Sequence, residues 1–365
     1  MEEQIKLPVE AKYSQKWHKY NLAKTNEKRL FVELLHDLSR IIQESKYSFG
    51  RPSIPLRDLF FCAGLKLYTG YSGRKAMSDI RHAKEAGYIS TAPHYNTLTE
   101  FLRCPATYDL FSKLLTISAM PLKKLEDQYS IDSSGFGSYQ YERWMRVRFN
   151  PEAKKKWRNY LKGHIMIGTR TNIICECEIT PGNFSDVRQA PSMVIKAGAN
   201  FDVKEISADK GYSSKLLFRI VQSIGALPYI AFKNNARLPD ENTADIWNQM
   251  FLLFRDKREE FFQHYHRRSN VEATFGMVKT RLGEFLKCKD YHSQRSELIM
   301  KFICHNICCL IQEMYENNIH IDFEKENKVF IDQKVPEELI TRDASKAQNP
   351  LDTDFSVSEN QGGDY

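Results

Sequence analysis

The stretch from Tyr265 to Lys279 constrains this chain more than any other. On a helix that turns by roughly 100° per residue, four polar or aromatic side chains share one edge: Tyr265, Arg268, Glu272 and Lys279. The adjacent edge carries apolar residues at the spacing of an amphipathic helix: Val271, Phe275, Val278 and Leu282. The spacing predicts a helix that packs along one edge and presents a single acid among bases on the next.

Two interpretations of the polar edge are open. Arg268 and Glu272 stand four residues apart, so a surface ion pair worth a few tenths of a kcal/mol would explain them. In the other interpretation, Glu272 works together with acids elsewhere in the chain. The remaining acidic motifs favour the second interpretation.

The overall charge narrows the class of partner. The chain of 365 residues carries a net charge of +7 at pH 7, although its C-terminal stretch is acidic. Excess lysine and arginine on a folded body favour a polyanionic partner such as nucleic acid. The N-terminus lacks the pattern of a secretion signal, and no apolar run is long enough to span a bilayer. We therefore expect a cytoplasmic protein without a membrane partner.

The eight cysteines are scattered and stand among apolar residues. Cys304, His305 and Cys308 could contribute to a metal site, but no second ligand pair with zinc-like spacing follows them. Buried, reduced thiols are the favoured interpretation.

Residues 1–125 form a predicted helical region. Its expected helices are joined by glycine-containing turns, which is typical of a helix-turn-helix-like DNA-binding module. These helices cover about 14–42, 56–68 and 74–86, with another beginning near 97. Cations gather at the turns and helix ends: Arg51, Arg57, Lys66, Arg74, Lys75, Arg81 and Lys84. The alternative is an all-helical packing domain that binds no ligand.

Residues 126–320 alternate between strand and helix patterns, which predicts an α/β fold with a mixed sheet and flanking helices. Strands are expected at 129–134, 164–169, 173–180, 203–208 and 228–232, with helices at 186–199, 216–224 and 297–314. The residues 164–180 have the pattern of a hairpin.

Two further segments differ in composition. The connection 139–162 interleaves cations with aromatics, among them Lys155 and Trp157, and suits either contact with DNA or a solvated loop. Residues 321–365 are polar and acidic, which predicts a disordered tail. We accordingly expect truncation after residue 322 to leave thermal melting unchanged.

Three carboxylates come from three different elements. Asp132 lies within an apolar strand, where an unpaired buried carboxylate costs on the order of several kcal/mol. Asp209 ends a strand just before a glycine-containing turn, where open sheets place working residues. A structural cluster held by Arg268 and Lys279 would explain Glu272 but not Asp132.

A divalent ion explains all three acids. Oxygen ligands of this number suit magnesium, and two such ions about 4 Å apart can activate water or a 3′-hydroxyl at a phosphodiester. The chain has no glycine-rich phosphate loop, so ATP hydrolysis is unsupported.

The residues that carry these acids resemble a known family. Tyr265, Arg268, Glu272 and Lys279 match the Y-x2-R-x3-E-x6-K signature of the DDE transposases of prokaryotic insertion sequences. Residues 131–136 resemble the first acidic motif of that family, 208–212 the second, and 52–70 its helical N-terminal segment. The resemblance covers roughly residues 50–315.

The resemblance implies an RNase H-like catalytic domain that binds two Mg²⁺ ions, with Mn²⁺ as a substitute, through Asp132, Asp209 and Glu272. It implies that the remaining members of the signature contact transposon-end DNA. The full set of expected DNA contacts is Tyr265, Arg268, Lys279, Arg267, Trp157 and Lys155.

The function expected from the resemblance is transposition. The protein would bind terminal inverted repeats, cleave a strand with water and join the 3′-hydroxyl to target double-stranded DNA, as a homodimer in the synaptic complex and in association with the nucleoid. The alternatives are a relative that only cleaves DNA and a DNA-binding protein without catalysis. The segment between Asp209 and Glu272 is short beside relatives that carry a β-rich insertion there. Such an insertion can assist the formation of a DNA hairpin at the transposon end, so the sequence leaves open whether cleavage passes through a hairpin.

Overall fold

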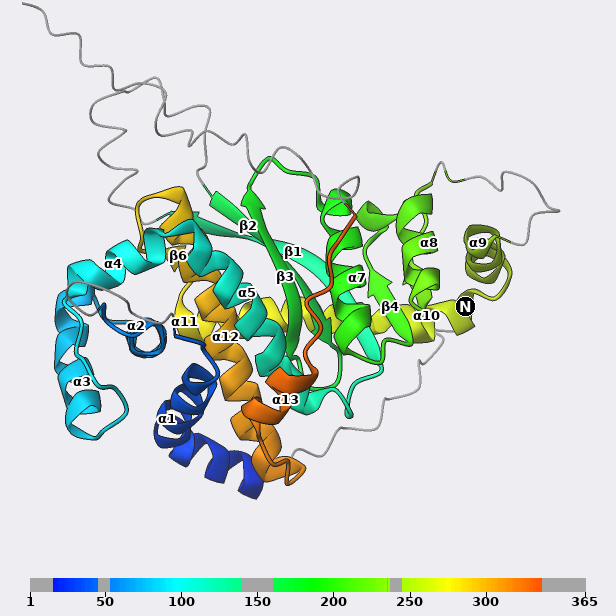
Figure 1. Cartoon of the computed structure of the whole chain (residues 1–365). Helices are drawn as coiled ribbons and strands as arrows, with labels where there is room; N and C mark the ends of the chain where they lie inside the picture. Colours follow the sequence, from blue (N-terminus) through cyan, green and yellow to red (C-terminus); the bar gives the residue numbers. More distant parts are fainter. Residues whose placement is uncertain (1–15, 45–52, 139–159, 235, 237–244, 337–365) are drawn as a thin grey trace, which may run out of the picture.

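A mixed sheet forms the centre of the computed structural model, which describes residues 16–44, 53–138, 160–234, 236 and 245–336 (Figure 1). The strand order is β3-β2-β1-β4-β5, and a short β6 pairs with the far end of β1. The strands are β1 (Gln128–Ser138), β2 (Tyr160–Gly168), β3 (Ile174–Pro181), β4 (Glu205–Ala208), β5 (Leu227–Ile230) and β6 (Phe285–Leu286). The α/β prediction with a mixed sheet is therefore confirmed.

The sheet changes direction at β1. Strands β1, β2 and β3 are antiparallel neighbours, whereas β4 and β5 run parallel to β1. The predicted hairpin is present as β2 and β3, and its turn contains Asn172 with a φ of 59°. Asparagine tolerates this left-handed conformation better than most residues.

The N-terminal helices and the sheet share one hydrophobic core. The helices are α1 (Trp17–Arg40), α2 (Leu56–Thr69), α3 (Gly73–Glu85), α4 (Tyr95–Arg103), α5 (Pro105–Ala119) and the short η1 (Met120–Leu122). In Figure 1 the long helix α12 (Tyr291–Glu316, orange) runs beside these helices, and it contacts α1, α2, α5 and β3. It is apolar on several sides, as the sequence predicted, because it packs against both parts of the chain.

The helices that flank the rest of the sheet are α7 (Ala190–Asn200), α8 (Lys215–Ser223), α9 (Ile246–Asp256), α10 (Arg258–Tyr265), α11 (Ser269–Leu282) and α13 (Phe323–Val329), with the short η3 (Asp186–Arg188), η4 (Lys210–Tyr212) and η5 (His266–Arg268). One expectation is wrong: Tyr265 to Lys279 is not a single helix, because η5 separates α10 from α11. None of the helices among the described residues is long and apolar enough to cross a membrane.

The sequence did not predict α9 and α10 as separate helices. Their aromatic side chains pack against the end of β5, where Phe232 contacts Trp247, Phe251 and Phe254 with ring centroids 4.9 to 5.5 Å apart. The helical spacing of Trp247, Phe251 and Phe254 is a signal that could have found α9.

The C-terminal segment differs from the expected tail. Residues 323–329 form α13, where Phe323 is buried and Lys123 Nζ lies 2.8 Å from Glu326 Oε2. Beyond it, the Asn200 side chain makes two hydrogen bonds of 2.9 Å with the backbone of Ile331. The expectation of disorder from residue 321 is therefore wrong for 321–336. It was based on the acidic composition of the whole stretch 321–365, which gives little weight to the single apolar residue Phe323. Residues 337–365 lie outside the described part of the chain.

Glu176 on β3 predicts a pH dependence of stability. Its side chain is buried and accepts a 2.7 Å hydrogen bond from Thr116 Oγ1, and burial raises its pKa from 4.5 to about 7. A raised folded-state pKa means that the native protein binds this proton more tightly than the unfolded chain does. The free energy of unfolding is therefore lowered progressively as pH rises through this range.

We expect Glu176→Gln to increase the free energy of unfolding by on the order of 2 kcal/mol at pH 8 and by much less at pH 5. Urea titrations at the two pH values measure the difference. Glu259→Gln at an exposed position of α10 serves as the control and should show no such pH-dependent gain. Equal effects of Glu176→Gln at both pH values would contradict the prediction.

Candidate active site

Two aspartates meet where β1 and β4 lie side by side. Ile131 of β1 stands opposite Ala208 of β4 in the parallel register, and each is followed by an aspartate. Asp132 continues within β1, whereas Asp209 leaves the end of β4. The sheet thus brings together two acids that are far apart in the sequence, as expected for the working edge of an open sheet.

Backbone amides hold both carboxylates. The amide of Ser133 donates to Asp132 Oδ1 over 2.8 Å, and the amide of Lys210 donates to Asp209 Oδ1 over the same distance. Asp209 is the N-cap of η4, so the end of β4 and the following turn fix its position.

Glu272 comes to the same place from α11 and is linked to Asp132 through Arg268. Arg268 Nη2 lies 2.9 Å from Glu272 Oε1, and Arg268 Nη1 lies 3.5 Å from Asp132 Oδ2. The ion pair considered in the sequence is therefore present, and it is part of the acidic site. The guanidinium neutralises two acids on different elements.

The acids influence one another's charge. Burial raises the pKa of Asp132, and the charges of Asp209 and Glu272 raise it further, whereas the Ser133 amide and Arg268 lower it. Burial lowers the pKa of Arg268, but Tyr265 and the nearby acids raise it, and the net change is an increase. Three carboxylates this close together favour a positive charge between them, which Arg268 provides.

The other members of the signature lie close to the same acids. Lys279 Nζ donates to Ser134 Oγ over 2.7 Å and lies 5.1 Å from the centre of the Phe136 ring. The Arg268 guanidinium lies 6.0 Å from the centre of the half-buried Tyr265 ring. The structure thus places both cations of the signature directly beside β1.

The remaining predicted DNA contacts have different outcomes. Arg267 is exposed in η5, next to Arg268. Trp157 and Lys155 lie outside the described residues. Cys304, His305 and Cys308 lie on α12, where the His305 imidazole makes a hydrogen bond with the carbonyl of Asn172.

Sequence reasoning assigned no role to Tyr212, which forms part of the site. The Tyr212 side chain is buried, and its pKa is raised well above the usual range by burial and by Asp132, Asp186 and Asp209. It is therefore a neutral phenol close to the acids. Its place in the Asp209-Lys210-Gly211-Tyr212 motif was the available signal.

The residues present suit a divalent cation by their chemistry. Three carboxylates provide the oxygen ligands that magnesium and manganese prefer. As the side chains stand, no group of three or more His, Cys, Asp or Glu residues in the described part of the chain is arranged to hold a metal ion. Arg268 supplies the counter-charge at this position, so a metal ion would have to displace it from Asp132 and Glu272.

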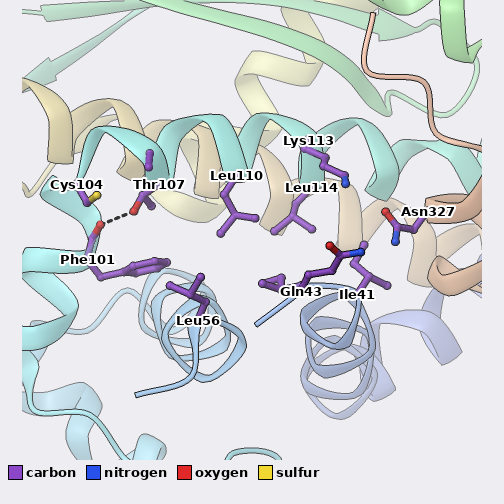
Figure 2. A pocket seen from close by; sticks show the side chains of 12 residues that line it. Ile41, Gln43, Leu56, Phe101, Cys104, Thr107, Leu110, Lys113, Leu114 and Asn327 are labelled. Atoms are coloured by element: carbon purple, nitrogen blue, oxygen red, sulfur yellow. Dashed lines mark hydrogen bonds between the residues drawn. The ribbon is translucent and has the colours of Figure 1, made fainter. Parts of the chain in front are cut away.

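A separate pocket lies among the helices, away from these acids. Figure 2 shows it between the end of α1, the start of α2, α5 and α13. Its lining is mostly apolar, including Ile41, Leu56, Phe101 and Leu110, and Lys113 is its one charged residue among those described. Without acids or histidines, it is no candidate for phosphodiester chemistry.

The strand order, together with acids on β1, after β4 and on α11, defines an RNase H-like fold that brings three carboxylates to one candidate site. The family described as "Transposase DDE domain" matches residues 123–307, just over half of the chain, so the protein belongs to the DDE transposases. No curated protein and no solved structure matches the chain.

This membership confirms the resemblance and establishes the general activity. The protein is a transposase and acts on DNA, and DDE transposases generally use divalent metal ions. The match begins in the turn before β1 and ends within α12, so it contains β1, the end of β4 and α11.

Proposed function

We propose that this transposase binds the terminal inverted repeats of a mobile element, cleaves the DNA with water and joins the freed 3′-hydroxyl to target DNA. The observation that carries the proposal is the meeting of Asp132 and Asp209 on parallel neighbouring strands, with Glu272 joined to Asp132 through Arg268. Cleavage of a phosphodiester with the help of divalent ions needs several carboxylates close together, and the fold brings these three from separate elements.

Asp132, Asp209 and Glu272 are the proposed ligands of two Mg²⁺ ions, and Mn²⁺ is the proposed substitute. When bound, such ions activate the attacking oxygen and stabilise the leaving oxygen of a phosphodiester. The chain's own part is to hold the acids: the Ser133 and Lys210 amides fix the two aspartates, and α11 presents Glu272.

Tyr265, Arg267, Arg268 and Lys279 are the proposed contacts to the DNA end. Arg268 and Lys279 now bind protein oxygens, and DNA phosphates offer both cations an alternative partner of higher charge. Trp157 and Lys155 of the basic connection are proposed to extend this contact.

Recognition of the repeats is assigned to the helical region 1–125. Helix α3 carries the exposed cations Arg74, Lys75, Arg81 and Lys84, and the Arg74 guanidinium lies 5.0 Å from the centre of the Tyr95 ring at the start of α4. Region 126–320 is the proposed catalytic domain. We further propose a homodimer in the synaptic complex and a location at the nucleoid.

A plasmid that carries the element between its own terminal repeats tests the proposal. With purified protein and Mg²⁺, we expect excision followed by joining to a second plasmid, and neither should occur with a chelator present. A scrambled-repeat plasmid is the control. Cleavage without joining would replace the proposal by a nuclease, and DNA binding that never leads to cleavage would replace it by a non-catalytic binding protein.

The proposed phosphate contacts of Arg268 and Lys279 lead to a prediction about salt. Arg268→Ala and Lys279→Ala should each weaken binding to the DNA end and reduce the slope of log affinity against log salt by about one unit for each phosphate that the variant no longer neutralises. Fluorescence anisotropy over a series of salt concentrations measures the slope.

Arg29→Ala is the matched control for this measurement. Arg29 is an exposed cation on α1 that pairs with Glu33 at 2.8 Å. Its removal should leave the slope unchanged. An unchanged slope in Arg268→Ala and Lys279→Ala as well would refute their contact with phosphates.

A further inference from the structure

We propose that the turn between β2 and β3 is a seat that positions Glu272, and that Asn270 and Thr274 are the positioning residues that bind it. The α11 seat consists of residues Thr169 to Asn172. The inference rests on the proposed role of Glu272, and it concerns how the chain places this carboxylate relative to Asp132.

The α11 seat is fixed to the strand that carries Asp132. The Thr169 amide donates to the carbonyl of Gln128 over 3.0 Å, at the start of β1. The buried carboxylate of Glu126 accepts from the amides of Arg170 and Thr171 over 3.1 and 2.6 Å. The turn and β1 therefore form one unit.

Helix α11 binds this unit through two side chains. Asn270 Nδ2 donates to the carbonyl of Thr169 over 2.6 Å. Thr274 Oγ1 lies 3.3 Å from Asn172 Oδ1 and 2.9 Å from the carbonyl of Asn270, so its hydroxyl links the turn to the same residue of α11. Each residue stands two positions from Glu272, which places it roughly 200° around the helix. The two contacts therefore hold the face of α11 opposite to Glu272.

Helix α12 supports the α11 seat from another side. His305 Nε2 lies 2.9 Å from the carbonyl of Asn172, so this nitrogen carries a proton and donates. Burial lowers the pKa of His305 to about 4, so the imidazole is neutral at neutral pH. The contact does not depend on a charge that salt or DNA could screen.

The α11 seat should contribute more to the position of α11 when DNA is bound at the site. In the structure, α11 is also tied to β1 through Arg268 with Asp132 and through Lys279 with Ser134. The proposed function requires both cations to exchange these partners for DNA. Asn270 and Thr274 are then the polar ties that still hold α11 in register with β1.

A small displacement of Glu272 should have a large effect on catalysis, because a shift of about 1 Å in a reacting group can cost a hundredfold in rate. Thr274→Val removes the hydroxyl while it keeps the shape of this buried side chain. We expect a fall of roughly tenfold to a hundredfold in single-turnover cleavage, with unchanged affinity for the DNA end.

Two variants separate positioning from folding. Thr274→Ser keeps the hydroxyl and should recover most of the activity, whereas Asn270→Ala should repeat the defect at a half-buried position that leaves little cavity. Thr280→Val makes the same chemical change at an exposed position of α11 and should behave as wild type. The Mg²⁺ concentration for half-maximal cleavage should rise in Thr274→Val and Asn270→Ala alone.

Hydrogen exchange gives a readout that needs no activity. Backbone amides of residues 269–276 should exchange faster in Thr274→Val than in Thr280→Val, with α12 unchanged. Unchanged exchange and cleavage in both Thr274→Val and Asn270→Ala would overturn the inference. A wild-type protein that never cleaves would overturn the proposed function instead, and the exchange rates would still decide whether the α11 seat holds α11.

Discussion

Asp132→Asn is expected to abolish DNA cleavage and joining while the protein stays folded and still binds DNA. Asparagine keeps the oxygen that accepts from the Ser133 amide, but it removes the charge that a divalent ion requires. Loss of several kcal/mol of charge stabilisation in the transition state corresponds to a fall on the order of a thousandfold or more.

The stability of this variant should not fall. Burial and the nearby charges of Asp209 and Glu272 raise the pKa of Asp132, so its negative charge is unfavourable in the native state. Neutralising it should keep or increase the melting temperature. Asp209→Asn and Glu272→Gln should show the same loss of cleavage.

The excision assay and a thermal melt, run together, measure both effects. Asp127→Asn is the control, because Asp127 is an exposed acid at the entry to β1 whose carboxylate lies 3.8 Å from Lys204 Nζ. It should cleave as wild type does. Excision and joining at wild-type rates in Asp132→Asn would exclude this carboxylate from the active site.

The parts of the site that follow local patterns could be predicted from the sequence. Asp132 and Asp209 were recognisable because each stands in or after a short apolar strand, and those strands are paired in the structure. The core edge of α11 was likewise visible in its spacing, and Val271, Phe275 and Val278 are buried. The helical spacing of apolar residues and the ends of strands depend on neighbouring residues, so both can be read from the sequence.

The parts that depend on distant partners could not be predicted. Asn270 meets Thr169 across 101 positions, and no local pattern distinguishes this asparagine from a solvated one. Tyr265 and Arg268 fit a continuous helix by spacing, yet η5 intervenes between α10 and α11. Helix α10 packs on β5 through aromatic side chains, with the rings of Phe261 and Tyr229 5.6 Å apart, and this contact too joins distant parts of the chain.

Truncation after residue 322 is expected to destabilise the protein, contrary to what the acidic composition of its C-terminal stretch indicates. The truncation removes α13 and with it the buried Phe323 side chain, the ion pair of Glu326 with Lys123, and Asn327 at the wall of the pocket in Figure 2. It also removes Ile331, whose backbone binds Asn200.

Loss of the buried phenylalanine alone costs about 3 kcal/mol, which lowers the melting temperature by roughly 5 °C in a chain of this size. Truncation after residue 336 is the matched control, because it keeps α13 and Ile331 while it removes most of the acidic stretch. It should melt as the full chain does. If both truncations melted alike, α13 would contribute nothing to the fold; if only the shorter chain melts early, α13 and the segment through Ile331 belong to the core that carries the active site.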